Sequence, residues 1–363
     1  MQNPLFSHVA ILGLGLIGAS LAKTLASKKL GTTISVFDTS PEAQLYAAGA
    51  GWKADYAHAG QAVENADLIV FAAPPAAFEA LAKDIAPFLK QGAVVMDVAS
   101  VKRHAVATIA PHLPAYVAFV PAHPIAGSEK TGAAASRDDL FKGKQVILTP
   151  KKQDLKSVPV TRIRTLWETL GAKIEYMPAE LHDRIYAYVS HLPQVVSFAS
   201  GKCLKGIPAE TDETFTRFMR LTHSDPALWA DICVLNADFI REALAAFTSF
   251  AGQMTGELSQ SQEEGNGNGH IAPQLLPMIV ATCLVATASL LQEDSGIHPA
   301  HFAGAGFSDM VSPATQDPHA ALAAISEHHH HIAHLLASFL RILHEMSDAL
   351  SAGDKNKLQK LFR

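Results

Sequence analysis

The stretch Ile11–Gly18, with the sequence I-L-G-L-G-L-I-G, constrains the fold of this chain more than any other feature. It matches the pattern G-x-G-x-x-G, it includes the end of the apolar run Val9–Leu12, and a helix-like run comes after it. A strand, a glycine-rich turn and a helix in this order open the βαβ unit that binds dinucleotides. Gly13 would make the tight turn, Gly15 would let the backbone approach a pyrophosphate, and Gly18 would allow close helix–strand packing. The stretch therefore predicts a Rossmann-type domain.

The acidic residue Asp38 indicates which dinucleotide is bound. Asp38 ends the strand-like run 33–37, and the three residues after it include no arginine. A carboxylate at this position accepts hydrogen bonds from a ribose diol and repels a 2′-phosphate, so we predict NAD as the cofactor and not NADP. The expected cofactor contacts are Gly13, Gly15, Leu16, Ile17, Gly18 and Asp38. The alternative is a glycine-rich turn in an α/β protein that binds nothing.

Composition argues against several classes of protein. The chain has 363 residues, enough for two domains, and 48% of them are hydrophobic. A net charge of −5 argues against broad nucleic-acid binding, which needs a basic surface. Three scattered cysteines favour a reducing compartment, and the N-terminus does not have the pattern of a signal peptide. The longest apolar run, near 272–291, contains two prolines and a glutamine, so we expect a buried helix, no membrane span and a cytoplasmic location.

Strand-like and helix-like runs alternate through the first half of the chain. The strand-like runs are 9–12, 33–37, 66–73, 93–98, 117–120, 146–148 and 173–176. This alternation predicts an α/β dinucleotide-binding domain over residues 1–178, a doubly wound parallel sheet between layers of helices. From residue 179 onward the pattern is helical, which predicts an all-α domain over 179–363. Its main helices are expected at 179–200, 227–254, 273–291 and 320–350, with a mobile polar loop at 257–269.

Polar residues follow two of the expected strands. One group is Asp97–Lys102, and the other is Pro121–Lys130. In doubly wound folds the ligand binds at the carboxyl ends of the strands, so these residues are candidates for a site. His123 is a candidate general base, because the ordinary pKa of a histidine, near 6.5, suits proton transfer at neutral pH. Ser100 would hydrogen-bond either this histidine or a substrate oxygen. The alternative is that His123 is a structural residue, as most of the 18 histidines must be.

Several motifs together resemble one enzyme family. They are Ser100-Val101-Lys102, the ten residues His123–Gly132 (H-P-I-A-G-S-E-K-T-G), His182-Asp183, Ser190–Pro193 and Ser224–Ile232. With the glycine-rich stretch, they resemble the prephenate/arogenate (cyclohexadienyl) dehydrogenases of tyrosine biosynthesis. The likeness covers about residues 8 to 250, and its ten-residue motif is far more specific than the glycine pattern.

The resemblance implies a reaction and a set of roles. Prephenate would lose hydride from C4 to the nicotinamide and a hydroxyl proton to a base, then expel CO2 to give 4-hydroxyphenylpyruvate. His123 would be the base, with Ser100 beside it as the second catalytic residue. The expected substrate-binding residues are Ser128, His191, Arg220, Ser224 and Trp229. The family also implies a homodimer through the helical domain, and arogenate as a further substrate. Arg217 departs from the family pattern and, as an extra cation, would disfavour arogenate.

An internal similarity appears within the helical half. Asp225-Pro226 and Asp317-Pro318 lie 92 residues apart, and at the same shift Ile240, Leu244, Phe247 and Met254 match Ile332, Leu336, Phe339 and Met346. This predicts a duplication over about 181–254 and 273–346, in which Ser312 takes the place of Arg220. The second copy would then cover surface that the family buries in a homodimer. The alternative is coincidence between two amphipathic helices.

A run of histidines in the second half of the chain raises the question of a metal site. His328–His331 are four consecutive histidines, which point in different directions on a helix and so do not predict a metal site.

A rival enzyme class is the NAD-dependent 3-hydroxyacid or imine-type reductases, which would not explain the motif His123–Gly132. A rival of another kind is a regulator that senses NAD without catalysis, for which His123 would be dispensable.

Overall fold

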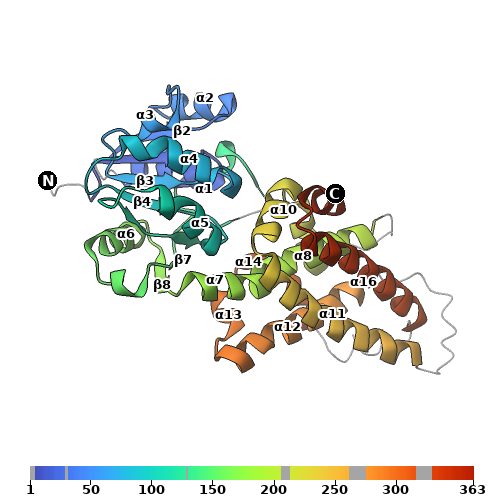
Figure 1. The fold of residues 1–363 in the computed structure, drawn as a ribbon. Helices are drawn as coiled ribbons and strands as arrows, with labels where there is room; N and C mark the ends of the chain where they lie inside the picture. Colours follow the sequence, from blue (N-terminus) through green and yellow to red (C-terminus); the bar gives the residue numbers. More distant parts are fainter. Residues whose placement is uncertain (1–4, 29–31, 128–129, 206–212, 261–274, 316–328) are drawn as a thin grey trace. The chain divides into compact units, whose positions relative to one another are not determined.

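The computed structural model describes residues 5–28, 32–127, 130–205, 213–260, 275–315 and 329–363. The chain divides into two compact units, Met1–Asp183 (unit 1) and Arg184–Arg363 (unit 2). Figure 1 shows that unit 1 is a sheet with surrounding helices and that unit 2 is helical. The expected α/β domain followed by an all-α domain is therefore confirmed.

Unit 1 is built on a five-stranded parallel sheet with the strand order β2-β1-β3-β4-β5. Its strands are β1 (His8–Leu12), β2 (Thr33–Phe37), β3 (Leu68–Phe71), β4 (Val94–Asp97) and β5 (Ala118–Phe119). The order reverses at β1, because β2 lies on one side of it and β3 on the other. Reversals of this kind create the crevice in which doubly wound folds bind ligands.

Helices cover both faces of this sheet (Figure 1). One buried cluster contains Val9 and Ile11 with residues of α1 (Leu16–Ser27), α2 (Pro41–Gly49) and α6 (Val158–Thr169). The other contains Ala10 and Leu12 with residues of α3 (Ala59–Val63), α4 (Phe78–Ile85) and α5 (Lys102–Ile109). Successive side chains of β1 thus enter opposite cores, as the two-residue period of a strand requires. Short 3₁₀ turns are η1 (Pro75–Ala77), η2 (Ala86–Phe88), η3 (Ala110–His112), η4 (Ala133–Ala135) and η5 (Lys152–Asp154).

The last strands of unit 1 form a separate sheet, which differs from the single sheet expected. β6 (Ala122–Pro124) pairs antiparallel with β7 (Gln145–Leu148), and β7 pairs parallel with β8 (Lys173–Tyr176). Pro121 has no N–H to donate, so the ladder between β4 and β5 ends before it. The chain then turns into β6, which places His123 opposite Ile147. His123 therefore lies on a short strand, just beyond the end of β5.

Unit 2 consists of helices and helical turns in the part of the chain that the structure describes. In order they are α7 (Ala179–Tyr186), a π-helical segment η6 (Ala187–His191), α8 (Leu192–Cys203), α9 (Glu213–Met219), η7 (Arg220–His223), α10 (Pro226–Leu235), α11 (Ala237–Gln260), α12 (Leu275–Ser295), α13 (Pro299–Phe302), α14 (Ala305–Val311), η8 (Ser312–Thr315), α16 (His329–Ser351) and α17 (Lys355–Leu361). Helix α7 begins in unit 1 and continues into unit 2.

Two expected helices are interrupted, and the second of them also continues further along the chain than expected. The helix expected over 179–200 contains the π-helical segment 187–191, because Pro193 has no N–H for the carbonyl four residues before it. The helix expected over 227–254 is divided at Asn236, between α10 and α11. Helix α11 continues to Gln260 into the stretch expected to be a loop, and residues 261–269 of that loop lie outside the described residues.

Helix α12 is the apolar helix that the sequence analysis expected to be buried. Among the described residues, it is the one helix long and apolar enough to cross a membrane, and 61% of its apolar window is buried inside the protein. It packs against α11 and α14 within unit 2. These contacts are those of a core helix in a helical bundle.

Candidate active site

The glycine-rich turn has the backbone that its sequence predicts. Gly13 has a φ of +101°, and a Cβ built there would lie 2.4 Å from the backbone nitrogen of Ala73. A Cβ on Gly18 would lie 2.2 Å from the carbonyl oxygen of Gly13. Gly15, which caps the N-terminus of α1, has no atom within 4 Å of an added Cβ. Two glycines are therefore required by the fold, and the third leaves space at the start of a helix, where N–H groups favour an anion such as a pyrophosphate.

Asp38 lies beside this turn. One carboxylate oxygen accepts a hydrogen bond from the backbone N–H of Leu14 at 2.6 Å, and the other accepts one from the N–H of Ser40 at 2.8 Å. The N–H of Gly13 donates to the carbonyl of Phe37 at 2.8 Å and joins the turn to the end of β2. The acid predicted to bind a ribose diol is thus held against the turn predicted to bind the pyrophosphate. Because a carboxylate offers about four acceptor positions, two backbone bonds leave capacity for a diol.

His123 is the first member of a hydrogen-bonded series of three side chains. Its Nδ1 lies 2.9 Å from Nε2 of His182, and Nδ1 of His182 lies 2.7 Å from Oδ1 of Asp183. The two imidazoles meet edge to face, with 5.1 Å between ring centroids. His182 and Asp183 are fully buried, and His123 is half-buried.

Asp183 is fixed by the N-terminus of α5. Its carboxylate accepts hydrogen bonds from the backbone N–H groups of Lys102 (2.7 Å) and Arg103 (2.9 Å), and from Nε of Arg103 (3.3 Å). Two helix N–H groups and a guanidinium favour the charged form of a carboxylate. Asp183 therefore acts as a buried anion that accepts a hydrogen bond from Nδ1–H of His182.

This geometry determines which nitrogen of His123 can act as a base. An ionised Asp183 only accepts, so Nδ1 of His182 carries the proton and Nε2 of His182 is an acceptor. Nδ1–H of His123 then donates to His182, and the lone pair of the neutral His123 ring is on Nε2. A histidine held in one tautomer by a buried carboxylate is an arrangement suited to general-base catalysis.

A buried ion pair connects this series to the central sheet. Nζ of Lys102 donates to Asp97 at the end of β4 and to the carbonyl oxygen of Ala122 at 2.5 Å, directly before His123. Asp97 and Lys102 have no exposed surface. Burial raises the pKa of Asp97 and lowers that of Lys102, and their mutual attraction opposes both changes. The pair thus holds strand β6, and with it His123, beside β4.

Ser100 and Ser128, the other expected polar partners in unit 1, are placed differently. Ser100 lies in the bend between β4 and α5, half-buried. No hydrogen bond joins Ser100 to His123 in the described part of unit 1. Ser128 lies outside the described residues.

His191 and Trp229 lie together in unit 2. His191 ends the π-helical segment and is fully buried, and its ring is 6.1 Å from that of Trp229. The side-chain amide of Asn236 donates to Nδ1 of His191 at 3.0 Å, which places the ring proton on Nε2. Such π-helical segments often occur at functional sites. His191 is thus oriented as a hydrogen-bond donor.

Arg220 and Ser224 lie at the two ends of the turn η7. Ser224 donates to the side-chain carbonyl of Gln194 at 3.2 Å, and Gln194 donates to the carbonyl of Leu221 at 2.7 Å, so α8 fixes this turn. Arg220 donates to Oδ2 of Asp309 through Nε (2.9 Å) and Nη2 (2.7 Å). A guanidinium presents five N–H donors in a planar fork, a geometry that suits the binding of carboxylates.

Four residues of the site had no role predicted from the sequence, although they lie in the motifs. They are Asp97, Lys102, His182 and Asp183. The signal that could have found them is chemical: charged residues in otherwise apolar surroundings need partners when they are buried. Gln194 and Asn236 gave no such signal, because single amides inside helices are common.

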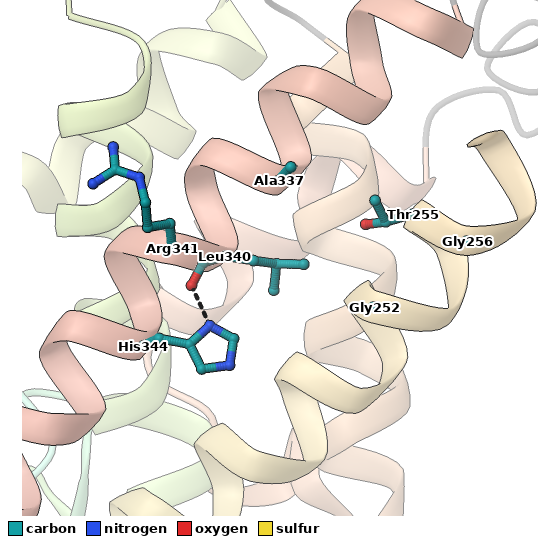
Figure 2. A pocket seen from close by; sticks show the side chains of 7 residues that line it. All are labelled: Gly252, Thr255, Gly256, Ala337, Leu340, Arg341 and His344. Atoms are coloured by element: carbon teal, nitrogen blue, oxygen red, sulfur yellow. Dashed lines mark hydrogen bonds between the residues drawn. The ribbon is translucent and has the colours of Figure 1, made fainter.

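A groove lies elsewhere in unit 2. It measures about 600 Å³ and runs between α11 and α16. Figure 2 shows the small residues Gly252 and Gly256 of α11 facing α16, where Nδ1 of His344 donates to the carbonyl of Leu340 at 2.7 Å. None of the expected site residues lines it. It is an opening between two helices and not the candidate active site.

A Rossmann-type turn with an adjacent acid, and an oriented histidine in the same unit, define the class of NAD-dependent dehydrogenases. Comparison with known proteins specifies the family. The family model "Prephenate dehydrogenase, nucleotide-binding domain" matches residues 21–176, and "Prephenate dehydrogenase, dimerization domain" matches 178–267 and 271–363. The chain therefore belongs to the prephenate dehydrogenase family.

Individual relatives agree with this assignment. A cyclohexadienyl dehydrogenase of Zymomonas mobilis is 33% identical over 251 residues, which are 67% of this chain and 85% of the relative. A prephenate dehydrogenase of Bacillus subtilis is 29% identical over 66% of this chain and 67% of its own. The crystal structure of an A. aeolicus prephenate dehydrogenase in complex with hydroxyphenyl propionate and NAD+ has a TM-score of 0.63 and 32% identity, and the match covers 71% of this chain and 92% of that one.

Proposed function

We infer that this protein is an NAD-dependent prephenate dehydrogenase, which converts prephenate to 4-hydroxyphenylpyruvate and CO2 in tyrosine biosynthesis. The observation that carries the inference is the series Asp183–His182–His123, which presents one unprotonated imidazole nitrogen. Family membership and the relatives' activities support the substrate. Arogenate differs from prephenate only in the side chain, and its acceptance is consistent with the same relatives.

We propose that Nε2 of His123 takes the proton of the C4 hydroxyl as the C4–H bond breaks. NAD, when bound, supplies the hydride acceptor. The carbonyl that forms at C4 draws the electrons of the C1–carboxylate bond into the ring, so CO2 leaves and the ring becomes aromatic. The proton on His123 is shared with His182, and the buried charge of Asp183 stabilises the resulting imidazolium.

The other site residues are proposed from their chemistry. Gly13, Gly15, Leu16, Ile17, Gly18 and Asp38 would hold NAD. Arg220 would bind a substrate carboxylate through charge-assisted bonds, and His191 would donate from Nε2. Trp229 and Ser224 would line the substrate, and Ser100 and Ser128 would lie near the reacting hydroxyl.

The direct test is an assay with two products. The purified full chain is mixed with NAD and prephenate, and NADH absorbance is followed together with CO2 release. We expect equal amounts of both, and no NADH with a 3-hydroxyacid in place of prephenate. NADH formation without CO2 would contradict an oxidative decarboxylation.

Replacing Asp183 by asparagine is expected to lower kcat by about 10²-fold or more, with little change in the KM for NAD. An amide NH2 facing His182 can donate to its Nδ1, which reverses both imidazoles and places a proton on Nε2 of His123. The measurement is the pH profile of kcat, which should change in shape as well as in height. Asp183→Glu should restore part of kcat, and Asp154→Asn, which changes an exposed carboxylate of the same unit, is the control. An unchanged pH profile of kcat in the Asp183→Asn variant would show that Asp183 has only a structural role.

Replacing Gly15 by alanine is expected to weaken NAD binding at least about tenfold, a loss of about 1.4 kcal/mol, without loss of stability. The added Cβ meets no protein atom but occupies space expected for the pyrophosphate. Titration with NAD and a melting curve measure the two effects. Gly49→Ala, which also meets nothing, is the matched control. If Gly15→Ala binds NAD as the wild type does, the cofactor does not approach this turn.

The family model also bears on partners and location. We propose that two dimerization domains pair to build the substrate side of the enzyme. In the homodimer that the sequence resemblance implies, the two domains would come from two chains. We propose a cytoplasmic location, in keeping with relatives that are biosynthetic enzymes.

A further inference from the structure

The two halves of unit 2 repeat the same elements at a shift of 92 residues. Helix α9 ends at 219 and α14 at 311, and the turns η7 and η8 begin at the next residue, 220 and 312. At the same shift the residues of the long helix α11 correspond to those of the long helix α16. The dimerization-domain model matches each half separately, at 178–267 and 271–363. We call these halves copy 1 and copy 2. The same junction between a helix and a turn in both halves, together with two matches to one family model, is not expected from two unrelated amphipathic helices.

The two copies contact each other through equivalent residues. Helices α11 and α16, which correspond to each other, lie side by side along their length (Figure 1). Phe247 of α11 and Phe339 of α16 occupy the same place in the repeat, and their rings pack edge to face at 6.2 Å. Both are fully buried. Contact between equivalent residues is what a two-fold axis produces, because a residue on the axis meets its own counterpart.

The remaining packing is reciprocal. Helix α11 of copy 1 packs on α12 of copy 2, and α16 of copy 2 packs on α8 of copy 1. Within copy 1, α11 makes far less contact with α8, and within copy 2, α16 makes far less contact with α12. Each copy therefore buries its long helix against the other copy, as in an isologous dimer, and neither copy has a complete core by itself.

Three polar residues of the candidate site in copy 1 are replaced in copy 2. At the shift of 92, His191 corresponds to Cys283, Gln194 to Ala286 and Arg220 to Ser312. Burial raises the pKa of the Cys283 thiol to about 12, so it stays neutral and packs as an apolar group. At these three positions copy 2 therefore has no imidazole, amide or guanidinium that could donate to a carboxylate.

Copy 2 nevertheless supplies a charged partner to copy 1. Asp309 occupies the place that Arg217 has in copy 1, and it binds Arg220 at 2.7 Å and Arg217 at 3.5 Å. The side chain of Asp309 is 12% exposed and that of Arg220 29%, so solvent screens the pair of these two residues only weakly. One copy retains the arginines and the other the acid, so the two copies are complementary and not interchangeable.

We propose that copy 2 is the built-in partner of copy 1, so that one chain forms the pseudo-dimer of dimerization domains and carries a single substrate site. The extent of one structural match supports this. The match to the A. aeolicus enzyme covers 92% of that enzyme but only 71% of this chain, so part of this chain has no counterpart there. The partner surface of the family is then already occupied within the chain. The protein is a monomer of 38.7 kDa.

The test is the mass of the full chain in solution, measured by light scattering after size exclusion from 1 to 100 μM. We expect the monomer mass throughout, and specific activity that does not change on dilution. The melting temperature should also be independent of protein concentration, because intrachain pairing is not subject to mass action. A stable dimer, or a melting temperature that rises with concentration, would overturn the proposal. Neither mass nor melting temperature depends on the substrate, so the assignment of function is tested separately.

A second measurement addresses the contact between copies. Asp309→Asn removes the charge that faces Arg217 and Arg220, and we expect the melting temperature to fall by about 2–4 °C, the shift typical of a 1 kcal/mol loss in a domain of this size. Asp348→Asn, an exposed carboxylate on α16, is the control and should leave the melting temperature unchanged. Equal melting temperatures for Asp309→Asn and the wild type would contradict a stabilising contact between the copies.

Discussion

Replacing His123 by asparagine is expected to lower kcat by about 10²–10⁴-fold, the contribution typical of a positioned general base, while the Kd of NAD stays the same. Asparagine keeps a donor toward His182 but offers no basic nitrogen to the C4 hydroxyl. Steady-state kinetics with prephenate and a separate titration with NAD measure the two effects. The split between them matters, because His123 has no proposed contact with the cofactor.

The matched control is His112→Asn, a half-buried histidine on η3 of the same unit. It should retain wild-type kcat. If the His123→Asn variant keeps its full activity in the cell while turnover of prephenate is undetectable in both proteins, the regulator that senses NAD is the better description. If it keeps wild-type kcat in vitro, the base lies elsewhere and the series Asp183–His182–His123 is structural.

Replacing Lys102 by methionine is expected to lower the free energy of unfolding by about 3–5 kcal/mol, because it leaves the fully buried Asp97 without its cation. The loss includes the bond from Nζ to the carbonyl of Ala122. Urea unfolding followed by tryptophan fluorescence measures it, since Trp52 and Trp167 are buried in unit 1. A loss below about 1 kcal/mol, the range of exposed pairs, would contradict a structural role for the buried pair.

The control for this prediction is another lysine paired with an acid. Lys83 bonds Glu79 on the exposed face of α4, with side chains 57% and 54% exposed. Lys83→Met should change the free energy of unfolding by less than about 1 kcal/mol, because exposed pairs are screened and mobile. The double variant Asp97→Asn with Lys102→Met should be more stable than Lys102→Met alone, because no unpaired charge is then buried.

The sequence was most informative where the chemistry is local. The glycine pattern, the acid at the end of β2 and the motif around His123 each occupy a few consecutive residues, and from them the Rossmann-type unit and the cofactor were predicted. The repeat at 92 residues was also visible, although it could not be distinguished from coincidence. The separate sheet β6-β7-β8 was missed, because a strand's apolar pattern does not say which sheet it joins.

The sequence by itself determined the class of fold, the choice of NAD and the identity of the candidate base, since each depends on residues that are neighbours along the chain. Only the tertiary structure decided which nitrogen of His123 is basic and what holds Arg220, because the partners are 59 and 89 residues away. Hydrogen bonds and ion pairs act over about 3 Å, so they exist only after packing has brought distant segments together.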